Sequence, residues 1–314
     1  MRNIESLSGG DQLRNPTLVL DKDGKIKAPL GIEKIINRNR DLWNNVDNNI
    51  DFENKLDVWT DEIALGIKKI RGDVNEEPKV SIIVPAYNEE SFILQLLDSI
   101  SKQKTNIATE VIIVVNDSTD RTASFVRKCG AEIIEYNIDG QYPPVAYARQ
   151  KGLEQAKGEI ILSTDADMIV GECWVDELTK PLIDNENTVI SIGNVNVYEE
   201  KLIPASLVNV INTISRKHEI KSKKSISIVP WSNIAFRKKD IVEIGGWPQE
   251  PFMEDTILVR KFKNIGKPEL CTRPEATIWT SGRRAMLSIN EFFEDFKKGG
   301  NHFLDKNGKL KIVR

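Results

Sequence analysis

The chain has 314 residues, which corresponds to about two domains of ~150 residues or to one large α/β domain with extensions. Its 44 lysines and arginines stand against 47 aspartates and glutamates, which argues against a general nucleic-acid-binding protein, because polyanion binders carry a basic excess. Three dispersed cysteines and two histidines exclude a disulfide framework, a CxxC zinc site and a histidine-rich metal centre. We therefore expect carboxylates to carry the chemistry.

The sequence contains no apolar run close to the ~20 residues of a membrane span. The longest run is Val111–Val115, and the N-terminal segment lacks the apolar region of a secretory signal. With cysteines expected to be reduced, these features favour a cytoplasmic location and no integral membrane segment. The lysines of residues 292–314 are compatible with peripheral membrane association.

Residues 1–78 are rich in Asn, Asp and Lys and contain two weak helical patterns, at 32–43 and 56–70. A polar linker follows at 71–78. We predict a partly helical extension that packs on the main domain, not an independent catalytic unit.

From residue 79 onward, short β-branched runs alternate with amphipathic stretches. We predict strands at 80–84, 111–115, 131–135 and 159–163, and helices at 89–100, 121–128 and 144–156. Asn88 is expected to cap the first of these helices, with Glu89 and Glu90 in its first turn. The alternation predicts βαβ units and a mainly parallel α/β sheet flanked by helices.

The second half of the sequence is less regular. We predict a strand at 189–197, a helix at 205–220, a mixed segment at 226–236, a break at 245–247, a helix at 254–264, a strand at 276–280 and a terminal helix at 289–297. The main domain is accordingly assigned to residues 79–284, and a helical tail to residues 285–314.

Polar clusters follow three of the predicted strands, at 85–90, 116–120 and 164–167. Ligands of parallel α/β sheets bind beyond the carboxyl ends of the strands, so the three loops should converge on one edge. Asp165 and Asp167 are spaced to point to the same side of an extended segment. Two such carboxylates favour a hard cation, Mg²⁺ or Mn²⁺, although a solvated turn is the alternative.

Further candidates each have a simpler structural interpretation. Glu254 and Asp255 open a helix whose dipole would keep a carboxylate ionised and able to accept a proton, but ordinary capping would also explain them. The remaining candidates are Pro85, Tyr87 and Glu89 for a nucleotide base, Arg149, Arg283 and Arg284 for phosphate, and Trp231, Asn233 and Trp247 for a sugar. Helix capping, surface arginines and core packing are the respective alternatives.

Six segments occur in an order and spacing that resemble family 2 glycosyltransferases of the GT-A fold. They are Val80–Glu89, Val114–Thr122, Ala148–Asp167, Trp231–Lys238, Gly245–Trp247 and Glu254–Asp255. The resemblance implies metal-assisted, inverting transfer of a sugar from a nucleotide-diphosphate sugar to a hydroxyl of a glycan, a lipid-linked molecule or a small molecule.

The resemblance also implies residue roles. Tyr87 and Glu89 would hold the base and ribose, Arg149 would lie near the nucleotide, and Asp167 would be the principal ligand of Mn²⁺ or Mg²⁺. Asp165 would contact ribose or metal. Asp255 would be the general base, with Glu254 beside it in the acceptor site.

The chain departs from the family pattern at two places. Val115, Asn116 and Asp117 stand where the family usually has two aspartates and a glycine, so Asn116 or Asp117 could meet the base. The Gln-x-x-Arg-Trp segment of processive synthases is absent, and Arg283 or Arg284 could instead meet the diphosphate. Two rival functions are a sugar-nucleotide pyrophosphorylase, whose Gly-rich basic loop is missing after the first strand, and a non-catalytic carbohydrate-binding protein.

Overall fold

The computed structural model describes residues 19–20, 26–27, 30–136, 144–198, 232–249, 254–271 and 273–280. The helices predicted at 205–220 and 289–297 lie outside these residues. Within them, no helix is both long and apolar enough to cross a membrane.

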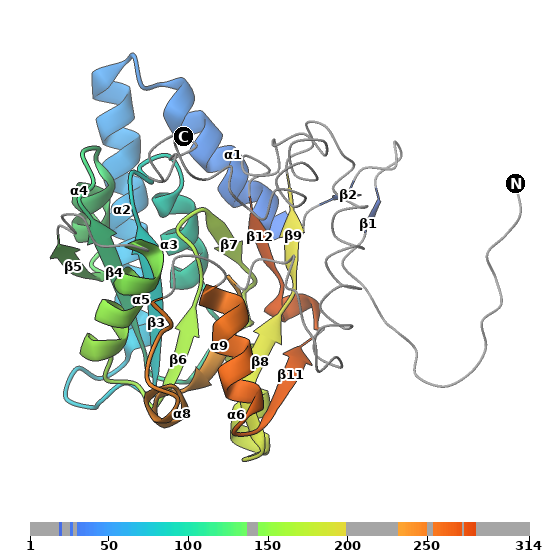
Figure 1. The fold of residues 1–314 in the computed structure, drawn as a ribbon. Helices are drawn as coiled ribbons and strands as arrows, with labels where there is room; N and C mark the ends of the chain where they lie inside the picture. The colour runs from blue at the N-terminus through green and yellow to red at the C-terminus, as the bar shows by residue number, and fades with distance from the viewer. Residues whose placement is uncertain are drawn as a thin grey trace, which may run out of the picture.

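A seven-stranded, mainly parallel sheet forms the centre of the fold (Figure 1). Its strands, in spatial order, are β11 (Lys267–Cys271), β8 (Thr188–Gly193), β10 (Ile234–Arg237), β6 (Ile160–Ser163), β3 (Val80–Ala86), β4 (Thr109–Asn116) and β5 (Glu132–Tyr136). Only β10 runs antiparallel to its two neighbours in this sheet. The predicted mixed α/β fold is therefore confirmed.

Helices cover both faces of this sheet. They are α3 (Ile93–Ser101), α4 (Thr122–Lys128), α5 (Pro144–Gln155), α6 (Trp174–Asp184), α8 (Lys238–Glu243) and α9 (Glu254–Lys263). Because side chains alternate along a strand, Ile82 packs in one apolar cluster with α3, α4 and α6. Its neighbour Ile83 packs in a second cluster with α5, α8 and α9.

The first strand is longer than predicted. The predicted strand ends at residue 84, before Pro85, but β3 continues to Ala86. Pro85 pairs with Val114 on the β4 side, whereas pairing with β6 stops at Ile83. Beyond Ile83, β3 has no paired neighbour on the β6 side. The backbone N–H that proline lacks is therefore not needed for pairing with β6, and proline is tolerated there.

The predicted strand at 189–197 is divided into two strands that belong to different sheets. After β8, the strand β9 (Val195–Val197) joins β7 (Met168–Val170) and β12 (Ile278–Thr280) in a small three-stranded sheet. The division falls next to Gly193, where an added Cβ would lie 2.3 Å from Asn233 Nδ2 and 2.6 Å from Ala276 O. This close approach, which depends on distant residues, explains why a continuous strand was the wrong prediction.

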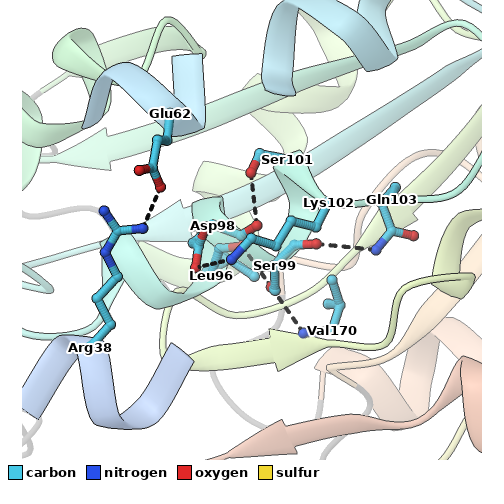
Figure 2. Close-up of polar contacts among 9 residues, drawn as sticks. All are labelled: Arg38, Glu62, Leu96, Asp98, Ser99, Ser101, Lys102, Gln103 and Val170. Atoms are coloured by element: carbon cyan, nitrogen blue, oxygen red, sulfur yellow. Dashed lines mark hydrogen bonds and ion pairs between the residues drawn. The ribbon is translucent and has the colours of Figure 1, made fainter. Parts of the chain in front are cut away.

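The N-terminal region forms two helices, α1 (Leu30–Asn44) and α2 (Asn49–Arg71), and the short strands β1 (Val19–Leu20) and β2 (Ile26–Lys27). Both helices extend beyond the predicted patterns. Phe52 and Trp59 of α2 are buried in the same apolar cluster as Ile82 of the central sheet, so the helices pack on the main domain as expected. An Arg38–Glu62 ion pair joins α1 to α2 (Figure 2). The domain boundary at residue 78 stays a prediction.

Helix α3 packs in the same apolar cluster as Ile82 of the central sheet, and it is also bonded to the small sheet, as the contact of Ser99 with Val170 shows (Figure 2). Ser99 Oγ accepts a hydrogen bond from Val170 N at 3.0 Å, and Gln103 Nε2 donates to Gly171 O at 2.6 Å. Asp98 of the same helix is buried and pairs with Lys102. The bonds of Ser99 and Gln103 hold the end of β7, the strand that directly follows Asp167.

Candidate functional site

The loops after β3 and β4 are joined by hydrogen bonds at the carboxyl edge of the sheet. Asn88 N donates to Ser118 Oγ at 3.0 Å, and Thr119 N donates to Asn88 Oδ1 at 2.9 Å. Asn88 has a left-handed backbone, with φ of 52°, which asparagine tolerates better than most residues. The predicted helix cap at Asn88 is therefore wrong, because α3 begins only at Ile93 and the Asn88 side chain bonds to the neighbouring loop.

A second group of bonds joins the same two loops. Glu89 N donates to Thr122 Oγ1 at 2.8 Å, and Glu90 N donates to Asp120 Oδ2 at 3.1 Å. Asp120 Oδ1 in turn accepts from Thr122 N at 2.9 Å. Glu89 and Glu90 thus precede α3 rather than forming its first turn, and their backbone is held by the loop after β4.

The candidate nucleotide-binding residues lie on these two loops. Tyr87 is exposed, with 39% of its surface accessible, while Glu89 is buried. Pro85 is half-buried near the end of β3, and Asp117 is exposed with φ of 45°. Asn116 ends β4, and its buried Oδ1 accepts no hydrogen bond from the part of the chain that the structure describes. The amide of Asn116 is thus better placed than a surface turn residue to meet a ligand.

Arg149 and Asp165 form an ion pair at the same edge. Arg149 Nη2 donates to Asp165 Oδ1 at 2.8 Å, and the two side chains are only 3% and 15% exposed. The Arg149 guanidinium carbon also lies 5.4 Å from the ring centroid of Trp247. Asp167, two residues after Asp165, is buried at 1% exposure. Sequence reasoning placed Arg149 near this loop but did not predict the ion pair.

Asp165 and Asp167 suit a cation whose remaining ligands are supplied by substrate phosphates and water. Among the described residues, no three His, Cys, Asp or Glu side chains are grouped closely enough to hold a metal ion. Arg149 already balances the charge of Asp165, so Asp167 is the better candidate ligand. Mg²⁺ and Mn²⁺ commonly bind through one or two carboxylates, with substrate phosphates and water completing the shell. The residues present fit such an ion.

The candidate general base lies at the start of α9. Glu254 and Asp255 are the first two residues of this helix. The next strand, β11, runs parallel to β8 and begins beside Thr188, at the amino edge of the sheet. Helix α9 must therefore start towards the carboxyl edge, where Asp165 lies.

The candidate acceptor residues that the structure describes are buried. Asn233 Nδ2 donates to Asn194 O and Ala276 O, each at 2.8 Å, and its Oδ1 accepts from Trp174 Nε1 at 2.8 Å. Trp247 is 2% exposed and packs edge-on against Phe236.

These placements agree with the packing alternative for Asn233 and Trp247, and an acceptor role for either stays a prediction. Trp231, Arg283 and Arg284 lie outside the described residues.

Residues 81–245, more than half of the chain, match the family described as Glycosyl transferase family 2. The chain belongs to this family. It is 28% identical over 211 residues to the probable glycosyltransferase YdaM of Bacillus subtilis, covering 64% of this chain and 50% of YdaM. It is 39% identical over 123 residues to the poly(ribitol-phosphate) beta-N-acetylglucosaminyltransferase TarS of Staphylococcus aureus, covering 36% and 20% respectively. This family 2 chain thus spans half or less of these relatives.

Solved structures of other proteins share the fold. The mannosyltransferase PcManGT of Pyrobaculum calidifontis superposes with a TM-score of 0.50 at 20% identity, covering 77% of this chain and 76% of that one. The crystal structure of S. aureus TarS gives a TM-score of 0.50 at 21% identity, covering 74% and 40%. At these identities the likeness supports the GT-A fold of the family 2 chain and nothing finer.

Proposed function

We propose that the chain transfers a sugar from a nucleotide-diphosphate sugar to an acceptor hydroxyl, with inversion at the anomeric carbon. The observation that carries this proposal is the convergence of Asn116, the Arg149–Asp165 pair and buried Asp167 at one edge of the sheet. A relative is named as a beta-N-acetylglucosaminyltransferase, and a structure with the same fold was solved with GDP-mannose and Mn²⁺.

In the proposed complex, the two bonded loops hold the nucleotide. Tyr87 offers an exposed ring to the base, Asn116 offers an amide oxygen to a donor group, and Glu89 lies within reach of the ribose. Arg149 holds Asp165 in place. Arg283 and Arg284 are further candidates for the diphosphate. The base itself is left open, because Asn116 and Asp117 replace the usual family residues.

Asp167 would hold Mn²⁺ or Mg²⁺, which when bound neutralises negative charge on the departing diphosphate. The acceptor oxygen forms a bond to the anomeric carbon, and the bond from that carbon to the diphosphate oxygen breaks. The diphosphate leaves with the electron pair, and Asp255 accepts the hydroxyl proton. Glu254 would lie beside it in the acceptor site. No covalent intermediate with the chain is required.

The proposal is tested with the purified chain, a panel of UDP-, GDP- and dTDP-sugars, and Mn²⁺. Binding is first found by thermal shift, because a ligand at about 100 times its Kd stabilises a protein by about 2.7 kcal/mol. Transfer then releases the nucleoside diphosphate. A pyrophosphorylase would instead form a nucleoside triphosphate when given pyrophosphate, and a non-catalytic binding protein would leave the donor intact.

The role of Asp255 is tested by Asp255→Asn. This variant should bind the donor with unchanged affinity and lose transfer, since the amide cannot take the hydroxyl proton. Turnover close to that of the unmodified chain would contradict the assignment. Cytoplasmic location and peripheral membrane association stay predictions.

A further inference from the structure

Arg121 lies in a cage of aromatic rings contributed from both sides of residue 78. Its guanidinium carbon is 5.4 Å from the ring centroid of Trp43 and 4.6 Å from that of Phe52, both in the N-terminal helices. The third ring is Phe125 of α4, at 5.3 Å. A guanidinium over ring faces is attracted by their π electrons, so the N-terminal helices restrict where this side chain can lie.

The polar groups of Arg121 are directed at the loop after β3. Its Nε donates to Glu90 Oε2 at 3.3 Å, and its backbone N donates to the same oxygen at 3.1 Å. On the other side, its Nη1 lies 3.8 Å from Glu53 Oε1 of α2. Arg121 therefore bridges a carboxylate of the extension and a carboxylate of the loop.

The backbone at Glu89 and Glu90 is also hydrogen-bonded to the loop after β4. Its backbone N donates to Asp120 Oδ2, and the adjacent Glu89 N donates to Thr122 Oγ1. The extension also touches this loop directly, since Asn39 Nδ2 of α1 donates to Ser91 O at 2.9 Å. One direct contact from the N-terminal helices, at Ser91, and one made through Arg121, at Glu90, thus converge on the residues that follow Tyr87 and Glu89.

We propose that Arg121 is a positioning residue for donor binding, and that the rings of the N-terminal helices hold it in place for this purpose. The idea rests on the proposed function, because its benefit is a preformed loop for the nucleotide. Arg121 contacts Glu90 and would act on the donor through this loop. A planar guanidinium can stack on rings and donate from a fixed direction at once, which a lysine ammonium cannot do.

Hydrogen exchange of the ligand-free chain tests the positioning without any substrate. In Arg121→Ala, the amides of Glu89 and Glu90 should exchange about tenfold faster, because local opening becomes easier. Lys128→Ala is the matched control, since Lys128 pairs with Glu53 and Asp57 of α2, and neither of these residues belongs to the loop after β3. Unchanged exchange in Arg121→Ala, or equal acceleration in Lys128→Ala, would overturn the proposal.

A second variant changes a ring of the cage that belongs to the N-terminal helices. Trp43→Leu should accelerate the same two amides, and combining it with Arg121→Ala should add little, since both changes act on one interaction. Fully additive effects would show that the ring acts on the loop by some other route and would refute the cage.

Kinetics with a nucleotide sugar supply the functional readout. Arg121→Ala should raise the donor KM about tenfold, keep kcat within about twofold and leave the acceptor KM unchanged, because only ground-state donor binding is affected. Arg121→Lys should restore little of the loss. A fall in kcat with an unchanged donor KM would contradict the role. If no nucleotide sugar is turned over by the unmodified chain, the proposed function fails, while the exchange measurements still decide the positioning.

Discussion

Arg149 and Asp165 form an almost fully buried ion pair, with Nη2 and Oδ1 2.8 Å apart. The guanidinium is 3% exposed, so contacts with protein groups, this carboxylate among them, replace most of its contact with water. Sixteen residues separate the two along the chain, and they come from helix α5 and the loop after β6. The pair links helix α5, which covers one face of the sheet, to the loop at the sheet edge that also contains Asp167.

Asp165→Asn should lower the free energy of unfolding by about 3 kcal/mol, because it removes the charged partner of a buried guanidinium. Urea unfolding measures the change. Glu154→Gln is the control, since it removes an exposed pair with Lys151 on α5 and should change stability by less than about 0.5 kcal/mol. Equal effects of the two substitutions would show that burial of the Arg149–Asp165 pair has no energetic consequence.

Chelation should abolish transfer, and Mn²⁺ or Mg²⁺ should restore it, as expected if a cation neutralises the leaving diphosphate. Asp167→Asn should raise the Mn²⁺ concentration for half-maximal activity at least about tenfold, as loss of even an outer-shell partner commonly does. Asp184→Asn, on the exposed end of α6, is the control. Full activity in EDTA would refute the metal role.

Asn233→Ala should destabilise the fold by about 3 kcal/mol, because it leaves the buried Trp174 indole N–H and two backbone carbonyls without this partner. Asn264→Ala, at an exposed turn, should have almost no effect. Thermal or urea unfolding distinguishes them. A stable Asn233→Ala protein with a raised acceptor KM would instead favour the acceptor role expected from the sequence.

Burial raises the pKa of the Cys129 and Cys271 thiols, so both should resist alkylation by iodoacetamide in the native chain at pH 8. Cys173 is more exposed and should react first, with mass spectrometry giving the order. All three should react together in urea.

The raised thiol pKa values also determine how the stability of the fold changes with pH. The protonated thiols favour the fold fully below pH of about 8.5, the ordinary thiol pKa, and this contribution falls as pH rises further. Rapid native labelling of Cys129 would contradict its burial.

The elements that sequence reasoning recovered are those with strong local patterns. Strands β3 and β4 are nearly continuous apolar runs, and the alternation with helices was enough for the fold. The break at Gly193 was missed because it depends on Asn233, forty residues later. Asn88 was assigned to a cap because its contact with Thr119 crosses two loops, which no local pattern reports.

The sequence also predicted which loops would lie close together, but not the contacts between their side chains. The three loops were predicted to meet at one edge because parallel strands direct their carboxyl ends there, whereas Arg149 was expected near the nucleotide only from the family resemblance. The buried pairing of Arg149 with Asp165 and the caging of Arg121 were not foreseen, because each requires knowing which helices meet. Burial of Trp247 was expected only as the alternative to a sugar-binding role.

The position of β10 has a consequence for how the chain is made. In the seven-stranded sheet, β8 is flanked by β10 and β11, and both are synthesised after it. While residues 80–193 emerge, β3, β4, β5 and β6 can pair in parallel, but β8 has neither neighbour and β6 keeps one open side. Unpaired strand edges invite association between chains. The nascent protein therefore exposes unpaired edges of β6 and β8 until Ile234–Cys271 leaves the ribosome, so association between chains is favoured during this stretch of translation.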